Sequence, residues 1–202
     1  FGCAATTAWG SLVNDAHCRL GDSVVVLGTG GVGLLVVDAA RAAGAHPIIA
    51  VDIHEGRLSH AIHMGATATL AADETDLEGA IRELLPLGRA DVVIETSGAQ
   101  SMVELSYKLA CDGGRAVLVG VPRHDEPARI DTLPLHFGTT LTGSKGGQVR
   151  PDIDIPRLLS LSEQGIYRVD KVPLEEFTLQ EVNSGIEALR SGVPGRIIVR
   201  MM

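Results

Sequence analysis

The sequence predicts an α/β fold in which six parallel strands form one doubly wound sheet. Short, continuous, β-branched runs recur along the first two thirds of the chain, and amphipathic helical patterns separate them. Continuous apolar runs are typical of parallel strands that helices cover on both faces. The chain has 24 glycines and only 3% aromatic residues, which suits the short turns and close helix-to-sheet packing of this class.

Each predicted strand is an apolar run, and the predicted helices carry an apolar face. The strands are expected at residues 24–27, 47–51, 67–70, 91–94, 115–119 and 139–143. The helices are expected at residues 32–44, 55–64, 75–87 and 99–110. In the helix over 75–87, for example, Leu77, Ile81 and Leu84 fall on one face. Strand and helix alternate, which favours a parallel, doubly wound sheet.

After about Gly146 the sequence changes character. The tract SKGGQVRPDID is polar and combines glycine, proline and charge, so we place a boundary there. One unit then covers residues 1–146 and a second covers residues 147–202. The second unit is expected to hold a helix over 151–164, a strand near 171–174, a helix that a capping box opens at 178–181, and a strand over 196–199. These elements are too few to close a domain by themselves.

Composition excludes several classes of partner. The chain has 17 Lys and Arg against 25 Asp and Glu, a formal net charge of −8. An acidic chain without a basic cluster is unsuited to nucleic acid or anionic membranes, and no apolar stretch approaches the roughly 20 residues that span a bilayer. Cys3, Cys18 and Cys111 are too few and scattered for a disulfide framework. We therefore expect a cytoplasmic protein that binds neither nucleic acid nor membrane.

A glycine-rich turn follows the first predicted strand. Residues 28–33, GTGGVG, satisfy G-x-G-x-x-G, and the strand before and helix after them make this match specific. Gly28 allows a tight turn, Gly30 lets a pyrophosphate approach the backbone, and Gly33 lets the helix pack close to the strand. The helix N-terminus offers free N–H groups to the phosphates. This pattern predicts a Rossmann fold that binds a dinucleotide.

Asp52 ends the second predicted strand, 24 residues after Gly28, where a ribose-binding carboxylate is expected. Such a carboxylate accepts hydrogen bonds from the adenosine ribose hydroxyls and repels a 2′-phosphate. The next residue, Ile53, offers nothing to a phosphate. NAD is therefore the predicted cofactor. A methyltransferase could use a similar turn and acidic residue, but the apolar, alanine-rich helix after the turn and the lack of a final reversed hairpin favour the dinucleotide fold.

Beyond these motifs, the chain resembles the coenzyme-binding domain and C-terminal segment of zinc-dependent, medium-chain alcohol dehydrogenases. The matching stretches are GCAATTAWG, GTGGVG, GAHPIIAVDIHEGR, MGAT, DVVIETSG, VLVGVP, DIPRLLSLSEQG and PGRIIV. Members of that family begin with a GroES-like catalytic domain, and because the sequence starts inside a matching stretch, we expect it to be a fragment of a longer protein. On this resemblance we expect residues 147–202, with a short remnant at the start of the chain, to belong to a catalytic domain that is mostly missing.

The resemblance also implies roles for individual residues. Cys3 matches the third ligand of a catalytic zinc, although a lone cysteine without that context is more often a buried apolar residue. Thr7 and Val32 match residues beside the nicotinamide, and Arg196 matches an arginine that binds the pyrophosphate. The implied cofactor-binding residues are Thr7, Gly28, Gly30, Gly31, Val32, Gly33, Asp52, Ile53, Arg57, Thr96, Gly120, Val121 and Arg196.

The function that the resemblance implies is hydride transfer between an alcohol or aldehyde and NAD, with a catalytic zinc in the full-length enzyme. Because the chain supplies only Cys3 as a zinc ligand, we expect it alone to hold no stoichiometric zinc and to be inactive. His60 and His63 could share a helical face, but we expect a solvated face there and no metal. The family also implies a homo-oligomer that pairs through the strand over 139–143.

Two other interpretations remain open. One is a stand-alone module that binds or senses NAD, and the other is a zinc-free quinone reductase of the same superfamily. Cys3 and Asp52 both argue against the quinone reductase.

Overall fold

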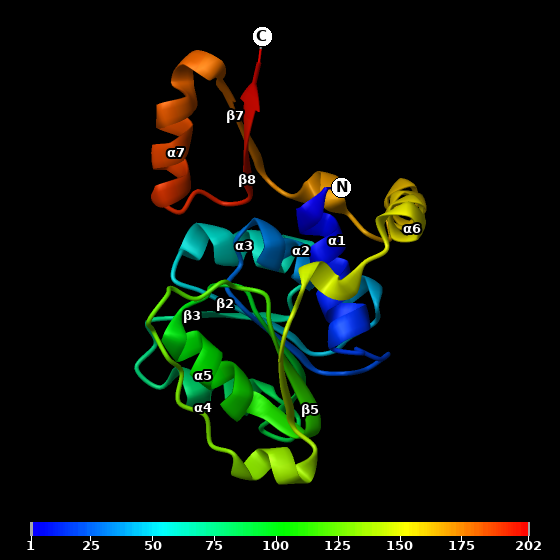
Figure 1. Ribbon diagram of the computed structural model, residues 1–202, viewed down its shortest axis with the longest axis vertical. Helices are drawn as coiled ribbons and strands as arrows, with labels where there is room; N and C mark the ends of the chain where they lie inside the picture. The colour runs from blue at the N-terminus through cyan, green and yellow to red at the C-terminus, as the bar shows by residue number, and fades with distance from the viewer. Residues whose placement is uncertain (1, 202) are drawn as a thin grey trace.

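The computed structural model describes residues 2–201 and confirms the α/β class. Six parallel strands form one sheet in the order β3-β2-β1-β4-β5-β6, and helices lie on both of its faces (Figure 1). The strands are β1 (Val24–Leu27), β2 (Ile48–Asp52), β3 (Ala68–Ala71), β4 (Ala90–Glu95), β5 (Ala110–Leu118) and β6 (Thr140–Gly143). The last strand, β6, runs parallel to β5, unlike the reversed hairpin that would indicate a methyltransferase.

Two apolar cores explain why the central strands are continuous apolar runs. Val24 and Val26 of β1 pack on one face of the sheet, and Val25 and Leu27 pack on the other. The first face is covered by α1 (Cys3–Gly10), α2 (Gly31–Ala42) and α3 (Glu55–Met64), and the second by α4 (Leu77–Leu84) and α5 (Gln100–Leu109). Since both faces are buried, neither face of β1 needs polar side chains.

The predicted elements of the main sheet form, with shifts at their ends. The largest shift is in β5, which begins at Ala110 and not at residue 115, because an irregular stretch around Gly113 and Gly114 is included in the strand. The pattern does not predict α1 or the π-helical turn at Ser11–Asp15, which lie in a tract of small residues.

Residues 147–201 contain α6 (Pro151–Glu163), β7 (Leu174–Thr178), α7 (Val182–Arg190) and β8 (Arg196–Arg200). The capping box at Thr178 is confirmed. The predicted strand near 171–174 is wrong: residues 169–171 form a 3-10 turn, and the strand begins only at Leu174. The carbonyl of Pro173 accepts from Arg196 N at 2.9 Å, but Pro173 has no N–H to donate, and the paired stretch with β8 starts at Leu174.

Buried polar contacts join Tyr167 and Arg168, which follow α6, to helices α1 and α2. Tyr167 is fully buried, donates its hydroxyl hydrogen to Ala5 O at 3.1 Å, and lies with its ring centroid 5.3 Å from that of Trp9. Asp38 of α2 is also fully buried and accepts from Arg168 Nε at 2.8 Å and Arg41 Nε at 2.9 Å. The segment that follows α6 is thereby fixed against α1 and α2.

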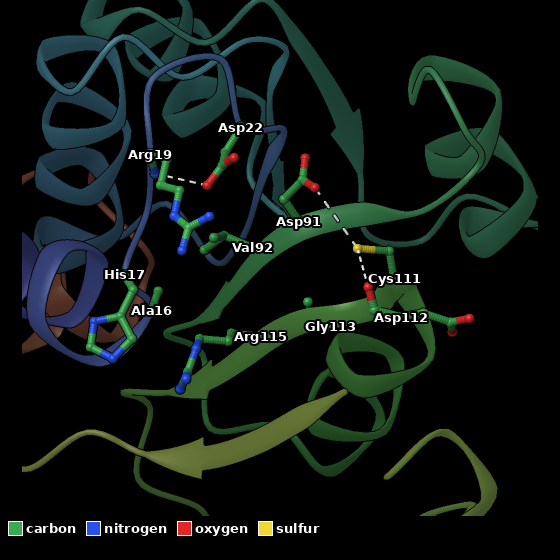
Figure 2. A pocket seen from close by; sticks show the side chains of 11 residues that line it. Ala16, His17, Arg19, Asp22, Asp91, Val92, Cys111, Asp112, Gly113 and Arg115 are labelled. Atoms are coloured by element: carbon green, nitrogen blue, oxygen red, sulfur yellow. Dashed lines mark hydrogen bonds between the residues drawn. The ribbon is translucent and has the colours of Figure 1, made fainter. Parts of the chain in front are cut away.

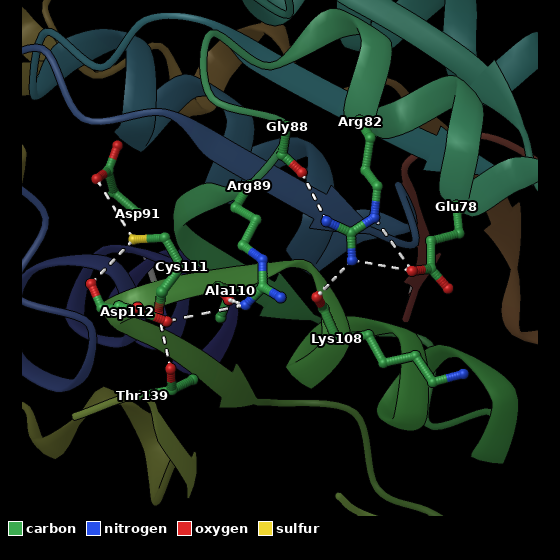
Figure 3. Close-up of polar contacts among 10 residues, drawn as sticks. All are labelled: Glu78, Arg82, Gly88, Arg89, Asp91, Lys108, Ala110, Cys111, Asp112 and Thr139. Atoms are coloured by element: carbon green, nitrogen blue, oxygen red, sulfur yellow. Dashed lines mark hydrogen bonds and ion pairs between the residues drawn. The ribbon is translucent and has the colours of Figure 1, made fainter. Parts of the chain in front are cut away.

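At the amino end of the sheet, arginines hold loops and helix ends together (Figure 3). Arg82 of α4 donates to Glu78, to Gly88 O at 2.8 Å and to Lys108 O at 2.9 Å, which connects α4 with the turn before β4 and with the end of α5. Thr139 donates to Cys111 O at 2.9 Å and ties β6 to β5. Within residues 2–201, no helix has the length and apolar character needed to cross a bilayer.

Candidate functional site

A cavity of about 490 Å³ lies at the carboxyl edge of the main sheet, where the strand order reverses between β1 and β4. Ligands of open parallel sheets bind at this point. Its lining residues are Gly28, Gly30, Val51, Asp52, Ile53, Arg57, Ala72, Thr96, Ser97, Ala99, Ser101 and Met102. They come from the ends of β1, β2, β3 and β4 and from the helices that follow β2 and β4.

The glycine-rich turn has the geometry that dinucleotide binding requires. Gly28 has a φ of 94°, in the left-handed region that favours glycine. An ideal Cβ placed on Gly33 would overlap the carbonyl oxygen of Gly28, so only glycine lets α2 pack against the turn this closely. At Gly30, by contrast, an ideal Cβ meets no atom within 4 Å. The backbone there is open to a ligand, as the binding of a pyrophosphate needs.

Asp52 lies at the edge of this cavity and is almost completely buried. Its Oδ2 accepts from Thr29 N at 2.7 Å and from Thr29 Oγ1 at 3.1 Å, and its Oδ1 accepts from His54 N at 3.0 Å. Asp52 therefore ties the glycine-rich turn to the end of β2, a structural role that the sequence does not reveal. Each carboxylate oxygen has two acceptor positions, so Oδ1 keeps one for a ligand.

Arg57 adds a positive charge to the same cavity. Its Nη1 lies 3.6 Å from Asp52 Oδ2, and its buried Nε has no hydrogen-bond partner among residues 2–201. The guanidinium group therefore has donors available beside the carboxylate that is expected to meet the ribose.

Thr96 and Glu95 connect the end of β4 to the glycine-rich turn and to the next loop. Thr96 Oγ1 donates to Gly28 O at 2.7 Å. Glu95 is fully buried, and its Oε1 accepts from Ser97 N at 2.6 Å and from Gly98 N at 2.9 Å. Burial raises the pKa of Glu95, although the hydrogen bonds from Ser97 and Gly98 oppose the rise. Sequence reasoning missed Glu95, but its position directly before Thr96 at the strand end was a usable signal.

The cavity brings together only part of the predicted site. Six predicted residues line it, namely Gly28, Gly30, Asp52, Ile53, Arg57 and Thr96. Thr7, Gly120, Val121 and Arg196 do not, and neither do Gly31, Val32 and Gly33 in the first turn of α2. Sequence reasoning missed the other six lining residues, which are Val51, Ala72, Ser97, Ala99, Ser101 and Met102. Asp52 is predicted partly because it ends a parallel strand, where the ligands of such sheets bind. The same reasoning at the end of β4 would have found Ser97.

Cys3 and Arg196, two of the remaining predicted residues, line a second cavity of about 250 Å³. Residues of α1, α2 and the β7 region complete its lining. An ideal Cβ on Gly31 would lie 3.0 Å from Arg196 Cγ, so the Arg196 side chain packs beside the first turn of α2. Arg196 is thus close to the helix N-terminus that is expected to bind the pyrophosphate.

The described residues do not form a zinc site by themselves. Cys3 is exposed, and residues 2–201 contain no group of three or more His, Cys, Asp or Glu side chains placed to hold a metal. A catalytic zinc needs three protein ligands. His60 and His63 lie on α3 with ring centroids 6.4 Å apart, without a third ligand in such a group.

A further cavity of about 290 Å³ lies at the opposite, amino edge of the sheet (Figure 2). Side chains of both signs line it, among them Arg19 and Arg115 as well as Asp22 and Asp91. Cys111 at its edge contacts Asp91 Oδ1 at 3.8 Å. Among residues 2–201, none of the three buried side-chain polar atoms without a partner belongs to a residue that lines it. The carboxyl-edge cavity is therefore the candidate site.

Comparison with known proteins agrees with this geometry. The family described as zinc-binding dehydrogenase matches residues 31–164. The chain is 33% identical to an NDMA-dependent alcohol dehydrogenase of Amycolatopsis methanolica, over 95% of this chain and 52% of the relative. It is 31% identical to the alcohol dehydrogenase class-2 isozyme 2 of Oryctolagus cuniculus, over 98% of this chain and 52% of the relative.

A solved structure shows the same arrangement of elements. The benzyl alcohol dehydrogenase from Acinetobacter calcoaceticus superposes with a TM-score of 0.93 at 30% sequence identity, covering 100% of this chain and 55% of that chain. The chain therefore spans about half the length of the relatives that it matches.

Proposed function

Because the chain belongs to the zinc-binding dehydrogenase family, we propose that it is the NAD-binding part of an oxidoreductase that transfers hydride between an alcohol or aldehyde and NAD. The observation that carries the proposal is one cavity in which the open backbone at Gly30 and the carboxylate of Asp52 lie together at the strand reversal. NAD, when bound, supplies the nicotinamide that takes up or gives the hydride.

The chain's own residues would hold the cofactor by its two polar parts. The N-terminus of α2, above Gly30, would bind the pyrophosphate, and Arg196 beside Gly31 would add positive charge there. Asp52 would accept from the adenosine ribose through the free position on Oδ1. A zinc in the full-length enzyme would need ligands in addition to Cys3.

We further propose a small alcohol or aldehyde as substrate, a homo-oligomeric assembly and a cytoplasmic location. The support for assembly is the position of β6 at one edge of the main sheet, where its outer side pairs with no other strand of residues 2–201.

Asp52 should give the chain a preference for NADH over NADPH. A 2′-phosphate removes the ribose hydroxyl that would donate to Asp52 and brings like charges together. A hydrogen bond to a charged group contributes about 1.5–3 kcal/mol, so its loss weakens binding about tenfold or more. Arg57, whose guanidinium group lies 3.6 Å from the Asp52 carboxylate and has free donors, would offset part of this repulsion but would not restore the lost hydrogen bond.

Fluorescence titration of this chain with both reduced cofactors tests the proposal. We expect NADH to bind more tightly, and Asp52→Ser to narrow the difference. Since Asp52 also supports Thr29, the control is Thr29→Val, which removes the Thr29 Oγ1 hydrogen bond but keeps the carboxylate. That variant should affect both cofactors alike. Equal affinities in the unmodified chain would remove Asp52 from this role, and no binding of either cofactor would overturn the proposed function.

A further inference from the structure

We propose that Glu95 is a positioning residue whose carboxyl group holds one wall of the cofactor cleft in the shape that binds NAD. The inference rests on the proposed function and adds a residue to it. Glu95 is not among the residues that line the cleft, so it acts through the two loops that its side chain and backbone connect.

The side chain of Glu95 fixes the turn that follows β4. Its Oε1 accepts from the backbone N–H of Ser97 and of Gly98 and from the Ser97 hydroxyl group. This turn supplies Thr96, Ser97 and Ala99 to the cleft wall. One carboxylate oxygen therefore sets the path of the backbone from which three lining residues project.

The same residue also holds the loop that follows β5. The backbone carbonyl of Glu95 accepts from Val119 N at 2.7 Å and from Gly120 N at 2.9 Å. An ideal Cβ on Gly120 would lie 2.6 Å from Glu95 Oε2 and would overlap Gly98 N. The carboxyl group, Gly98 and Gly120 thus pack in contact, which leaves room only for glycine at position 120.

The turn that Glu95 holds also contacts the glycine-rich turn at residues 28–33. Thr96 Oγ1 donates to Gly28 O. An ideal Cβ on Gly28 would lie 2.8 Å from Thr96 Oγ1. A shift of the turn would therefore move Thr96 against the glycine-rich segment. Ser97 packs there too, since the same Cβ would lie 3.1 Å from Ser97 N, so Glu95 is connected to the proposed pyrophosphate site through both Thr96 and Ser97.

The burial of Glu95 makes a purely stabilising role a poor explanation. Its Oε2 is buried and has no hydrogen-bond partner among residues 2–201. An unsatisfied buried oxygen is costly, so the presence of this carboxyl group calls for a reason other than stability. At the other end of the same strand, Asp91 is exposed and bonds Ser23, so β4 itself does not require a buried acid.

The test compares variants of Glu95 that differ only in their acceptor. Glu95→Gln keeps an acceptor oxygen for Ser97 and Gly98, whereas Glu95→Leu has a similar size and none. Fluorescence titration with NADH should show Kd raised about tenfold or more in Glu95→Leu and within about threefold of the unmodified chain in Glu95→Gln. Asp91→Asn, at the amino end of the same strand, is the control and should leave the Kd unchanged.

Hydrogen exchange without cofactor provides the second measurement. The amides of Ser97 and Gly98 should lose protection in Glu95→Leu and keep it in Glu95→Gln and Asp91→Asn. Should Glu95→Leu not fold, Glu95→Asp takes its place, because its shorter side chain keeps the charge but withdraws the acceptor from the turn.

Three results would overturn the inference: unchanged NADH affinity in a folded Glu95→Leu, equal weakening in Glu95→Gln and Glu95→Leu, or equal weakening in Asp91→Asn. If the unmodified chain binds no NADH, both the proposed function and the effect of Glu95 on cofactor binding are overturned. The exchange experiment tests the positioning of the turn separately. Retained protection at Ser97 and Gly98 in Glu95→Leu would show that Glu95 does not hold the turn.

Discussion

At the level of single residues, three of the buried carboxyl groups, those of Asp38, Asp52 and Glu95, fix turns and segments of this chain in place. Asp52 holds the glycine-rich turn through Thr29, Glu95 holds the turn after β4, and Asp38 binds Arg168. The sequence predicts Asp52 because its distance from Gly28 is set by one strand–helix–strand unit. It does not predict the other two, because their partners are determined by the path of a turn or by a segment 130 residues away.

Cysteine reactivity should differ sharply among the three thiols. Cys3 is exposed, whereas burial raises the pKa of Cys18 to about 12, with the nearby charges of Asp22 and Asp91 adding to the rise. Burial also raises the pKa of Cys111. Because the thiolate is the nucleophile, the raised pKa leaves Cys18 almost entirely in the unreactive thiol form at pH 8. Peptide mapping by mass spectrometry during iodoacetamide treatment should therefore show Cys3 modified first.

The control for this reactivity order is Cys3→Ser, which should abolish the rapid phase. Modification of Cys18 as fast as that of Cys3 would contradict the expected order and the burial behind it.

At the level of elements, apolar patterning predicts the strands that are buried on both faces of the sheet. It predicts the elements after α6 less well. The main strands follow their runs because α2 and α5 cover opposite faces of one sheet. The strand predicted near residues 171–174 fails, since a proline and a tight turn decide where β7 begins. Likewise, the segment after α6 is held by Tyr167 and Arg168, whose partners lie in α1 and α2.

Removing the Arg168 guanidinium should destabilise the fold. Arg168 donates through Nε and Nη2 to the fully buried Asp38 and also to Met64 O at 2.7 Å. Because Arg41 would still pair with Asp38, we expect Arg168→Met to lower the free energy of unfolding by about 1.5–3 kcal/mol. Urea denaturation measures the change.

The matched control is Arg190→Met, which removes an exposed pair with Glu187 and should cost about 1 kcal/mol or less. Equal losses in the two variants would show that the Asp38 contact adds nothing beyond an ordinary surface ion pair.

At the scale of the whole molecule, the order of strands brings together residues that the sequence can only propose separately. Gly28, Asp52 and Thr96 meet in one cavity because β1 lies between β2 and β4. Cys3 and Arg196 lie in a different cavity, since they belong to the parts of the chain that pack around the start of α2. Helix α7 has an apolar face that β7 and β8 cover only in part, because Ile186 is 43% exposed and Leu189 is 59% exposed.

This partly uncovered face should make the chain self-associate. Leu179, in the turn directly before α7, is 47% exposed as well, and exposed apolar groups that lie together favour association. The net charge of −8 opposes it, so association should increase with salt, which screens the repulsion. Sedimentation velocity should show an average mass that rises with protein concentration and with salt.

The double variant Ile186→Lys/Leu189→Lys should remain monomeric under the same conditions. Leu87→Lys is the control, because Leu87 is 89% exposed but lies after α4, in the main unit. A monomeric unmodified chain would show that the α7 face is too small to drive association. Association that persists in the double variant would instead place the contact elsewhere, and the open edge at β6 is the next surface to test, because its unpaired backbone groups can bind another strand.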